Sequence, residues 1–246
     1  MTGREDGAPV IVAVSPHLDD AAFSAGGFLA GAVARGARVR VATVFTATVA
    51  DPQGFALACQ TDKGYSPDVD YMAMRRAEDE AAMAALGAEW VHLGLPEAPH
   101  RGYHSAPALF GPVVAGDESV PELVAEVLER ELTRGGAPDL VLGPRALGDH
   151  VDHRHVRDAL EIVAARHGLR AVQWDDLPYA LRLEPGAGGA HGSAASAVDM
   201  AAKLDACAAY PSQLGFQFGD VATMRSALRG RAEIFDTDPR ALLPHR

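Results

Sequence analysis

The amino-acid sequence predicts an α/β fold in which helices cover both faces of a mostly parallel β-sheet. Two observations support this prediction. Short β-branched runs alternate with helix-compatible stretches along the chain, and the first run, residues 10–14, is apolar without interruption. An uninterrupted apolar run is typical of a strand buried on both faces, and regular strand–helix alternation implies parallel strands joined by crossover helices.

Strands and helices follow one another through the first two thirds of the chain. Strands are expected at residues 10–14, 37–45, 89–93, 139–142 and 169–174, and helices at residues 21–35, 71–86, 121–134 and 153–167. Gly87 and the pair Gly135-Gly136 stand where glycine commonly ends a helix. Residues 46–70 and 94–118 carry turn residues and are expected to be loops. This order corresponds to a Rossmann-like three-layer sandwich.

The last third of the chain gives weaker patterns. Residues 179–183 alternate as an edge strand would, residues 198–209 and 220–229 have helical spacing, and the Gly-, Ala- and Ser-rich residues 186–193 are expected to be mobile. No linker divides the sequence, and its 246 residues suit one α/β domain. We therefore expect residues 1–246 to form a single domain.

Composition and charge exclude several classes of function. A net charge of −11 argues against a nucleic-acid partner, because phosphate binding needs a basic surface. The first residues lack the apolar core of a secretory signal, no stretch suits a transmembrane helix, and the two cysteines have no CxxC partner. These features predict a cytoplasmic protein that binds neither membranes nor nucleic acid, and they do not identify a substrate. They leave a homo-oligomer open.

One histidine and two aspartates directly follow the first predicted strand. His17, Asp19 and Asp20 lie within four residues, at the carboxyl end of the strand, where open α/β sheets bind their ligands. Two carboxylates so close repel each other unless a proton or a cation lies between them, and a divalent metal would supply that cation. The alternative interpretation is a polar turn in which Asp20 caps the following helix.

A second polar cluster, His150, Asp152 and His153, follows the fourth predicted strand and can meet the first at the same rim of the sheet. Three protein ligands with one open position are typical of a catalytic zinc site, and His17, Asp20 and His153 can supply them. A solvated turn with Asp152 as a helix cap is the alternative. His155 is expected to point away, since residues two apart on a helix do not share a face.

The remaining polar side chains of the two clusters suit proton transfer. Asp19 would be free to act as a general base on water. His150, held by the carboxylate of Asp152, suits stabilisation of an oxyanion or protonation of a leaving amine. In the long loop, residues 100–104 lie near the same rim and are candidates for contact with a substrate. His92, within a strand pattern, is expected to be structural.

The two clusters resemble the signature of PIG-L (LmbE-like) zinc-dependent N-deacetylases, an AHPDDE-type motif after the first strand and a later HxDH motif. Residues 16–20 with Gly26-Gly27 are similar to the first motif, and residues 150–153 to the second. Further similarities are Arg75 and Glu78 with Leu86-Gly87 (an R-x-x-E...LG helix), residues 93–97 (an LG-x-PD loop), and Lys203 with Ser212-Gln213 (a K-x-x-A...SQ segment). The resemblance spans roughly residues 9–215.

The resemblance implies a role for each matching residue. His17, Asp20 and His153 would bind Zn²⁺ or another divalent transition metal. Asp19 would be the base that activates water, and His150, oriented by Asp152, would stabilise the tetrahedral intermediate or protonate the amine. Substrate-contacting groups of the family correspond to Arg75 and Glu97.

Three positions depart from the pattern. Leu18 stands where proline is usual, and Ala21 where an acidic residue is usual. Gly148 stands where some sugar deacetylases of the family carry a tyrosine. Tyr103 or Tyr71 could replace that tyrosine, or the metal and histidine could act alone. These departures leave the metal ligands intact and the substrate open.

The expected function is therefore a zinc-dependent hydrolase of linear amides. It would remove an acyl group, most simply acetyl, from an amino sugar or an amino-sugar-containing small molecule in natural-product or thiol-cofactor metabolism. A non-catalytic, metal-containing α/β ligand-binding module is the alternative, favoured by Ala21 and Gly148. A nucleotide-binding Rossmann protein is set aside, because no G-x-G-x-x-G motif follows the first strand.

Overall fold

A mixed sheet lies at the centre of the computed structural model, which describes residues 7–134, 136–182 and 189–243. Its seven strands have the order β3-β2-β1-β4-β5-β7-β6. The first five strands in this order are parallel to one another, β7 is antiparallel to β5, and β6 is antiparallel to β7. Their bounds are Val10–Ser15 (β1), Arg38–Phe45 (β2), Glu89–Leu95 (β3), Leu140–Pro144 (β4), Ala171–Trp174 (β5), His191–Ser193 (β6) and Glu233–Phe235 (β7).

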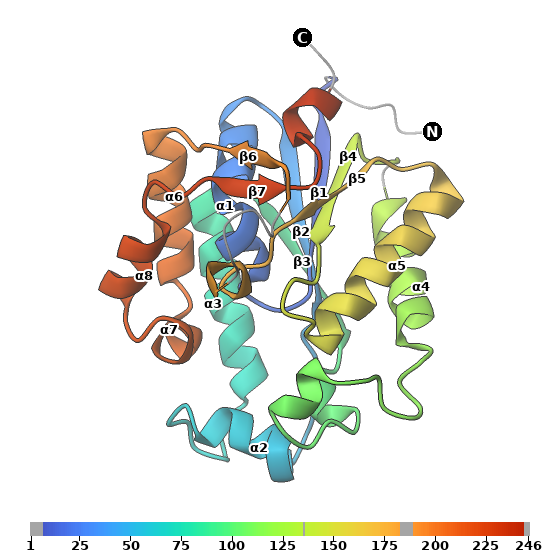
Figure 1. The fold of residues 1–246 in the computed structure, drawn as a ribbon, viewed down its shortest axis with the longest axis vertical. Helices are drawn as coiled ribbons and strands as arrows, with labels where there is room; N and C mark the ends of the chain where they lie inside the picture. The colour runs from blue at the N-terminus through green and yellow to red at the C-terminus, as the bar shows by residue number, and fades with distance from the viewer. Residues whose placement is uncertain (1–6, 135, 183–188, 244–246) are drawn as a thin grey trace.

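Helices cover both faces of this sheet, as the sequence predicts. Figure 1 shows α4 and α5 on one side and α1, α3, α6 and α8 on the other. The helices are Asp20–Ala34 (α1), Gly54–Thr61 (α2), Tyr71–Leu86 (α3), Val120–Leu132 (α4), Val151–His167 (α5), Ala197–Ala208 (α6), Pro211–Gln217 (α7) and Val221–Leu228 (α8). None of the described helices is both long and apolar enough to span a bilayer.

Strand β1 explains why the sandwich has three layers. Successive side chains of a strand point to opposite faces, and the apolar run of β1 therefore supplies two cores. Ile11 and Ala13 belong to the core formed with α1, α3 and α6. Val12 and Val14 belong to the core formed with α4 and α5. The continuous apolar pattern of β1 thus reflects burial on both faces, and the α/β prediction is confirmed.

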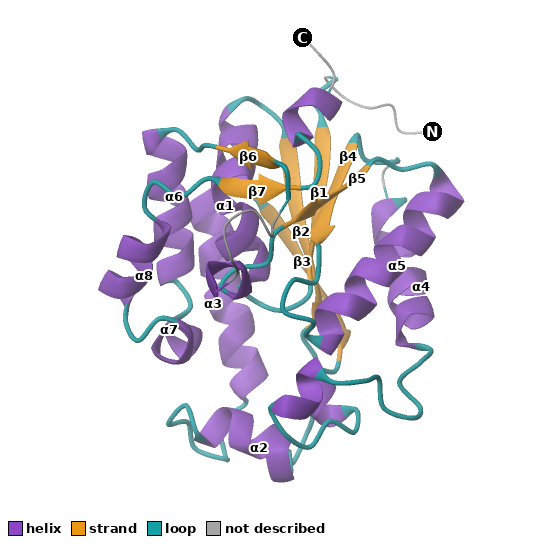
Figure 2. Cartoon of the chain, viewed as in Figure 1, coloured by secondary structure: helices purple, strands orange, loops and turns teal. Residues whose placement is uncertain are grey.

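Strands β1 and β4 are neighbours in the sheet, and their carboxyl ends lie at the same rim. Ile11, Val12 and Ala13 pair with Leu140, Val141 and Leu142. The chain leaves β1 into α1 and leaves β4 into α5 at this rim, seen below the sheet in Figure 2. The polar residues that follow each strand are therefore brought together.

Several expected elements differ from the structure. Residues 46–70, expected to be a loop, contain α2. Residues 179–182 form a 3₁₀ turn, Tyr179–Arg182, and no strand. Its backbone hydrogen bonds close locally, from the amide of Ala180 to the carbonyl of Asp176 and from Leu181 to Pro178. Residue 183 of that expected strand lies outside the described residues.

The carboxyl-terminal edge of the sheet was also not predicted. Within the stretch 186–193, expected to be mobile, His191–Ser193 forms β6 and pairs with β7; residues 186–188 lie outside the described part of the chain. Strands of three residues give too short a pattern to detect. Helix α5 starts at Val151, two residues before its expected start, which places Asp152 and His153 in its first turn.

Candidate metal centre and active site

A compact turn after β1 sets the first polar cluster. The Ser15 hydroxyl donates to the carbonyl of His17 at 2.7 Å, and its oxygen accepts the amide of Ala21 at 3.0 Å. The carboxylate of Asp20 accepts the amide of His17 at 2.8 Å. Asp20 is the first residue of α1, and Asp19, the N-cap, makes no side-chain capping bond in the described structure. The interpretation of Asp20 as a helix cap is therefore wrong.

His17, Asp20 and His153 come together although their motifs are far apart in sequence. The rings of His17 and His153 have centroids 5.2 Å apart. Asp20 Oδ2 lies 3.2 Å from His17 Nδ1 and 3.3 Å from His153 Nε2. One donor atom from each of the three residues lies within 4.8 Å of the others. This arrangement can hold a divalent cation.

The donor atoms themselves fit such an ion. His153 Nε2 is buried and has no hydrogen-bond partner among the described residues. A buried polar nitrogen without a partner is costly and calls for an explanation. Two imidazole nitrogens and one carboxylate oxygen are typical ligands of zinc in catalytic sites. A cation between them would give His153 Nε2 its missing partner.

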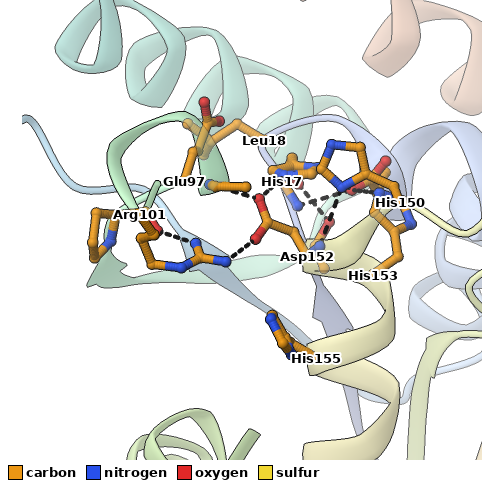
Figure 3. A network of polar contacts seen from close by, with 12 residues as sticks. His17, Leu18, Glu97, Arg101, His150, Asp152, His153 and His155 are labelled. Carbon is orange, nitrogen blue, oxygen red and sulfur yellow. Dashed lines mark hydrogen bonds and ion pairs between the residues drawn. The ribbon is translucent and has the colours of Figure 1, made fainter. Parts of the chain in front are cut away.

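Each of the two histidines is held by a carboxylate on the ring nitrogen that faces away from Asp20. His17 Nε2 lies 2.9 Å from Asp152 Oδ2, and His153 Nδ1 lies 2.7 Å from Asp176 Oδ1. Carboxylates in this position fix the tautomer and the orientation of metal-binding imidazoles. The contact of Asp152 with His17 is visible in Figure 3.

The electrostatics of the cluster favour positive charge. Burial alone would lower the pKa of His17, but hydrogen bonds to Asp152 and Asp20 outweigh it and raise the pKa to about 9. Burial is likewise outweighed at His153, where the charge of Asp20 raises the pKa well above its usual range. The pKa of Asp20 is lowered despite burial, because both histidines face it. A divalent cation at this position would be stabilised by the same negative charges.

Asp19 lies beside the cluster in a strained backbone conformation. Its φ of 147° is in the region that favours glycine, and such strain is concentrated at functional sites. Burial and the charge of Asp20 raise the pKa of Asp19 to about 7. Gln217 Nε2 donates to its carboxylate at 2.9 Å. A carboxylate that titrates near neutrality can both accept and return a proton.

His150 is the N-cap of α5 and remains neutral. Its Nδ1 accepts the backbone amide of Asp152 at 3.2 Å, which places the ring proton on Nε2. Burial and the charge of His17 lower the pKa of His150 to about 3. The prediction that the Asp152 carboxylate holds the His150 ring is wrong. That carboxylate contacts His17, the amide of Ala98 and Arg101. Asp152 is therefore not the cap of α5.

A cavity of about 550 Å³ opens over these residues. Its polar floor includes His17, Asp19, Asp20, His150 and Asp152. Apolar side chains also line it, among them Phe55, Leu109, Phe110, Tyr179 and Phe216. Phe216 is 78% exposed and Phe110 43% exposed, so two aromatic rings are available to a ligand. The volume suits a small molecule.

Arg75 and Glu97, the expected substrate-contacting pair, both line this cavity. They form an ion pair with Nη1 and Oε1 2.6 Å apart, and Arg75 Nη2 donates to the carbonyl of Leu18 at 3.2 Å. The pair thus adjoins the turn that carries Asp19. It offers both donors and acceptors to a polar ligand.

The space beside Gly148 is filled by a tyrosine that sequence reasoning missed. A Cβ at Gly148 would lie 2.9 Å from the ring of Tyr179, which also packs edge-on against His153 with centroids 5.5 Å apart. Tyr71 lines the cavity as well. Tyr103 is fully buried and donates its hydroxyl to Asp117 at 2.9 Å, so it is excluded as a replacement for the missing tyrosine.

Two further histidines, His92 and His155, take structural positions. His92 Nε2 lies 2.9 Å from Asp79, as expected for a structural residue. His155 points away from the cluster and binds Asp117 at 2.9 Å, again as expected (Figure 3). In the loop 100–104, Arg101 reaches Asp152 beneath the cavity floor and is not among the residues that line the cavity.

Sequence reasoning missed Asp176, Gln217 and the role of Arg101. A signal was available for Asp176, because Asp175-Asp176 directly follows β5, the next parallel strand at the same rim. Gln217 and Arg101 reach the site through contacts between segments 198 and 51 residues apart in sequence. No local sequence pattern predicts such contacts.

The chain is similar in sequence to proteins described as deacetylases. Residues 12–164 match the PIG-L family, described as GlcNAc-PI de-N-acetylase. Over 171 residues the chain is 37% identical to 2'-N-acetylparomamine deacetylase of Streptomyces fradiae. The alignment covers 68% of this chain and 56% of that protein. The chain thus spans little more than half the length of that relative.

Solved structures share the fold over most of the chain. The A40926 pseudoaglycone deacetylase Dbv21 is 32% identical, with a TM-score of 0.71, and the alignment covers 84% of this chain and 83% of that one. The zinc-inhibited form of teicoplanin deacetylase Orf2 is 29% identical, with a TM-score of 0.77 and coverage of 89% and 90%.

Proposed function

Because the chain belongs to the PIG-L family, we propose that it is a zinc-dependent N-deacetylase of linear amides. Residues 1–246 would act as one deacetylase domain. The observation that supports this most directly is the convergence of His17, Asp20 and His153 around a point beside Asp19. A ligand-binding module would need neither the strained backbone of Asp19 nor a buried imidazole, that of His150, packed against both histidines of the metal site.

His17, Asp20 and His153 would hold the ion, and their nitrogen and oxygen donors suit zinc. When bound, zinc supplies Lewis acidity, which polarises an amide carbonyl and lowers the pKa of water. The remaining side chains of the floor supply proton transfer and hydrogen bonds.

Asp19 is the proposed general base. Its carboxylate takes a proton from water as the water oxygen forms a bond to the amide carbon. The same proton then passes from Asp19 to the amide nitrogen as the carbon–nitrogen bond breaks, which releases a carboxylic acid and a free amine. A base with a pKa near 7 can carry out both transfers.

His150 is the proposed oxyanion donor. Its neutral ring carries the proton on Nε2, because Nδ1 is occupied by the backbone amide of Asp152. A preorganised donor in a buried site stabilises charge that develops in the transition state. Tyr179, which lines the cavity beside His153, is placed to assist in the role left open by Gly148.

Amino-sugar-containing small molecules are the proposed substrates. The relatives named above act on an acetylated paromamine and on the antibiotic pseudoaglycone of A40926, which favours a place in natural-product biosynthesis. The Arg75–Glu97 pair would bind polar groups of the sugar. Phe110 and Phe216 would contact the apolar part of a larger substrate.

Acetate release tests the proposal. The protein is stripped with a chelator, reloaded with one equivalent of Zn²⁺, and assayed on N-acetylated amino sugars and pseudodisaccharides that include 2'-N-acetylparomamine. We expect turnover that depends on zinc and is lost in D19N. A protein that binds no divalent metal, or a zinc-loaded protein that releases no acetate from the panel, would reject the proposed function.

A further inference from the structure

We propose that Arg101 is a positioning residue that, through Asp152, fixes His17 in the orientation needed to bind the metal. The inference rests on the proposed zinc site, since it concerns how one ligand of that site is held. Arg101 lies in the loop between β3 and α4 and belongs to neither of the two motifs that surround the metal site. Its position relative to Asp152 and His17 is shown in Figure 3.

The first step of the argument is the carboxylate of Asp152, which is completely buried. Its Oδ2 faces His17 Nε2 at 2.9 Å and also accepts the amide of Ala98 at 3.1 Å. Its Oδ1 accepts Arg101 Nη2 at 2.6 Å. Among the described residues, Arg101 is the one charged donor that reaches Oδ1, so its loss would leave that oxygen without a charged partner in a buried environment.

The second step is the way in which Arg101 is itself fixed. Its Nε and Nη2 bind the two oxygens of Asp117, at 2.8 and 3.2 Å, as a bidentate pair. Its Nη1 donates to the carbonyl of Pro96 at 2.6 Å, and the guanidinium lies 4.7 Å from the ring centroid of Phe45. The planar fork of arginine makes these contacts together, and a lysine ammonium cannot.

The third step is the support of Asp117. Tyr103 donates its hydroxyl to Asp117 Oδ2 at 2.9 Å, and His155 Nε2 lies at the same distance from that oxygen. Both side chains are buried, and His155 comes from α5, the helix that also carries His153. A series of buried and partly buried contacts therefore runs from α5 through Asp117, Arg101 and Asp152 to His17.

This series of contacts determines which ring nitrogen His17 offers to the metal. With Asp152 on Nε2, the ring is oriented so that Nδ1 points to Asp20, 3.2 Å away. If Asp152 shifted, the ring could turn and the donor set of His17, Asp20 and His153 would lose its geometry. Substitution of a residue that orients a metal ligand in this way typically weakens metal binding by about 10- to 100-fold.

Zinc affinity, measured by chelator competition on the folded full-length protein, tests the inference without any substrate. We expect R101M to weaken zinc binding by about 10- to 100-fold, and R101K to weaken it as well. R154M is the matched control: Arg154 ties the same loop to α5 through the carbonyl of Gly111, at 2.5 Å, and is not in the chain that reaches His17. R154M should leave zinc affinity unchanged.

A double-mutant cycle separates positioning from a general structural role. If Arg101 acts through Asp152, R101M should weaken zinc binding much less in a D152N background than in the wild type. Additive effects, or an R101M effect no larger than that of R154M, would overturn the inference. A wild-type chain that binds no zinc would overturn it together with the proposed function. A chain that binds zinc in this way but releases no acetate would reject only the deacetylase. If R101M does not fold, R101K carries the same comparison.

Discussion

The two histidines of the candidate metal centre are held in different ways. Asp176, which holds His153, is itself held by the backbone amide of Leu147 at 2.8 Å. Asp152, which holds His17, also accepts a backbone amide, that of Ala98 at 3.1 Å, but its other oxygen binds the side chain of Arg101, which Asp117 holds in turn. The carboxylate behind His153 is thus anchored by the backbone next to the sheet, whereas the carboxylate behind His17 depends in addition on a series of ion pairs that includes a loop residue.

The difference has a physical consequence. A contact with the backbone persists as long as the fold does. A buried ion pair fails when either partner is changed, because the remaining charge is left unpaired. We therefore expect the His17 half to be sensitive to distant substitutions that the His153 half tolerates.

The largest effect is expected at Asp19, which belongs to neither half. D19N should lower kcat by about 10²- to 10⁴-fold, because it removes the general base, and should leave zinc affinity nearly unchanged. The adjacent variant D20N is the matched comparison and should lose zinc. Steady-state kinetics with zinc titration distinguishes them, and a D19N enzyme with wild-type kcat would contradict the proposed role.

The next effect is expected beside the His153 half, at Tyr179. Y179F should lower kcat by roughly 10²-fold if its hydroxyl assists the oxyanion, with little change in zinc affinity. G148A should disturb the same ring, because the added Cβ would meet it at 2.9 Å and the residue has a φ of +88°. Unchanged kcat in Y179F would leave His150 as the sole donor from the protein.

A smaller effect sharpens the comparison itself. D176N should weaken zinc binding by about 10- to 100-fold. Because Asp176 and Arg101 support different histidines, D176N and R101M should have additive effects on the free energy of zinc binding. Strong coupling between them would show that the two halves are not independent.

The smallest effect concerns stability and pH. Burial opposes ionisation of Asp117, but Arg101 outweighs it and lowers the pKa of Asp117 below its usual range. A lowered folded-state pKa stabilises the fold above the unfolded-state value of about 3.9, and this contribution is lost as the pH falls through the lower folded-state value. D117N should therefore unfold more easily than the wild type at pH 7, by about 1–3 kcal/mol.

Denaturant titrations at several pH values check this prediction. The difference in the free energy of unfolding between the wild type and D117N should shrink at acidic pH. A difference that grows on acidification would have the wrong sign.

The parts predicted from sequence are those that depend on local patterns. The apolar run of β1, the polar residues after β1 and β4, and parallel strand order were enough to bring His17, Asp20 and His153 to one rim. Strands β6 and β7 have three residues each, too few for a period.

The contacts that orient the ligands could not be predicted. Whether Asp152 faces His150 or His17 depends on the ring orientation of His17, which is 135 residues away in sequence. Arg101 could be recognised as a rim residue, but its partner Asp152 is set by how the loop folds under the cavity. Such choices are made by packing of side chains from distant segments, which leaves no trace in a single sequence.

The position of zinc in crystals of the loaded protein tests the central claim most directly. Within the described part of the chain, two groups of residues could hold an ion: His17 with Asp20 and His153, and His17 with His150 and Asp152. We expect one anomalous peak at zinc–ligand distances of about 2.0–2.2 Å from His17 Nδ1, Asp20 and His153 Nε2. A peak between His17, His150 and Asp152, or no ordered zinc, would contradict the assignment.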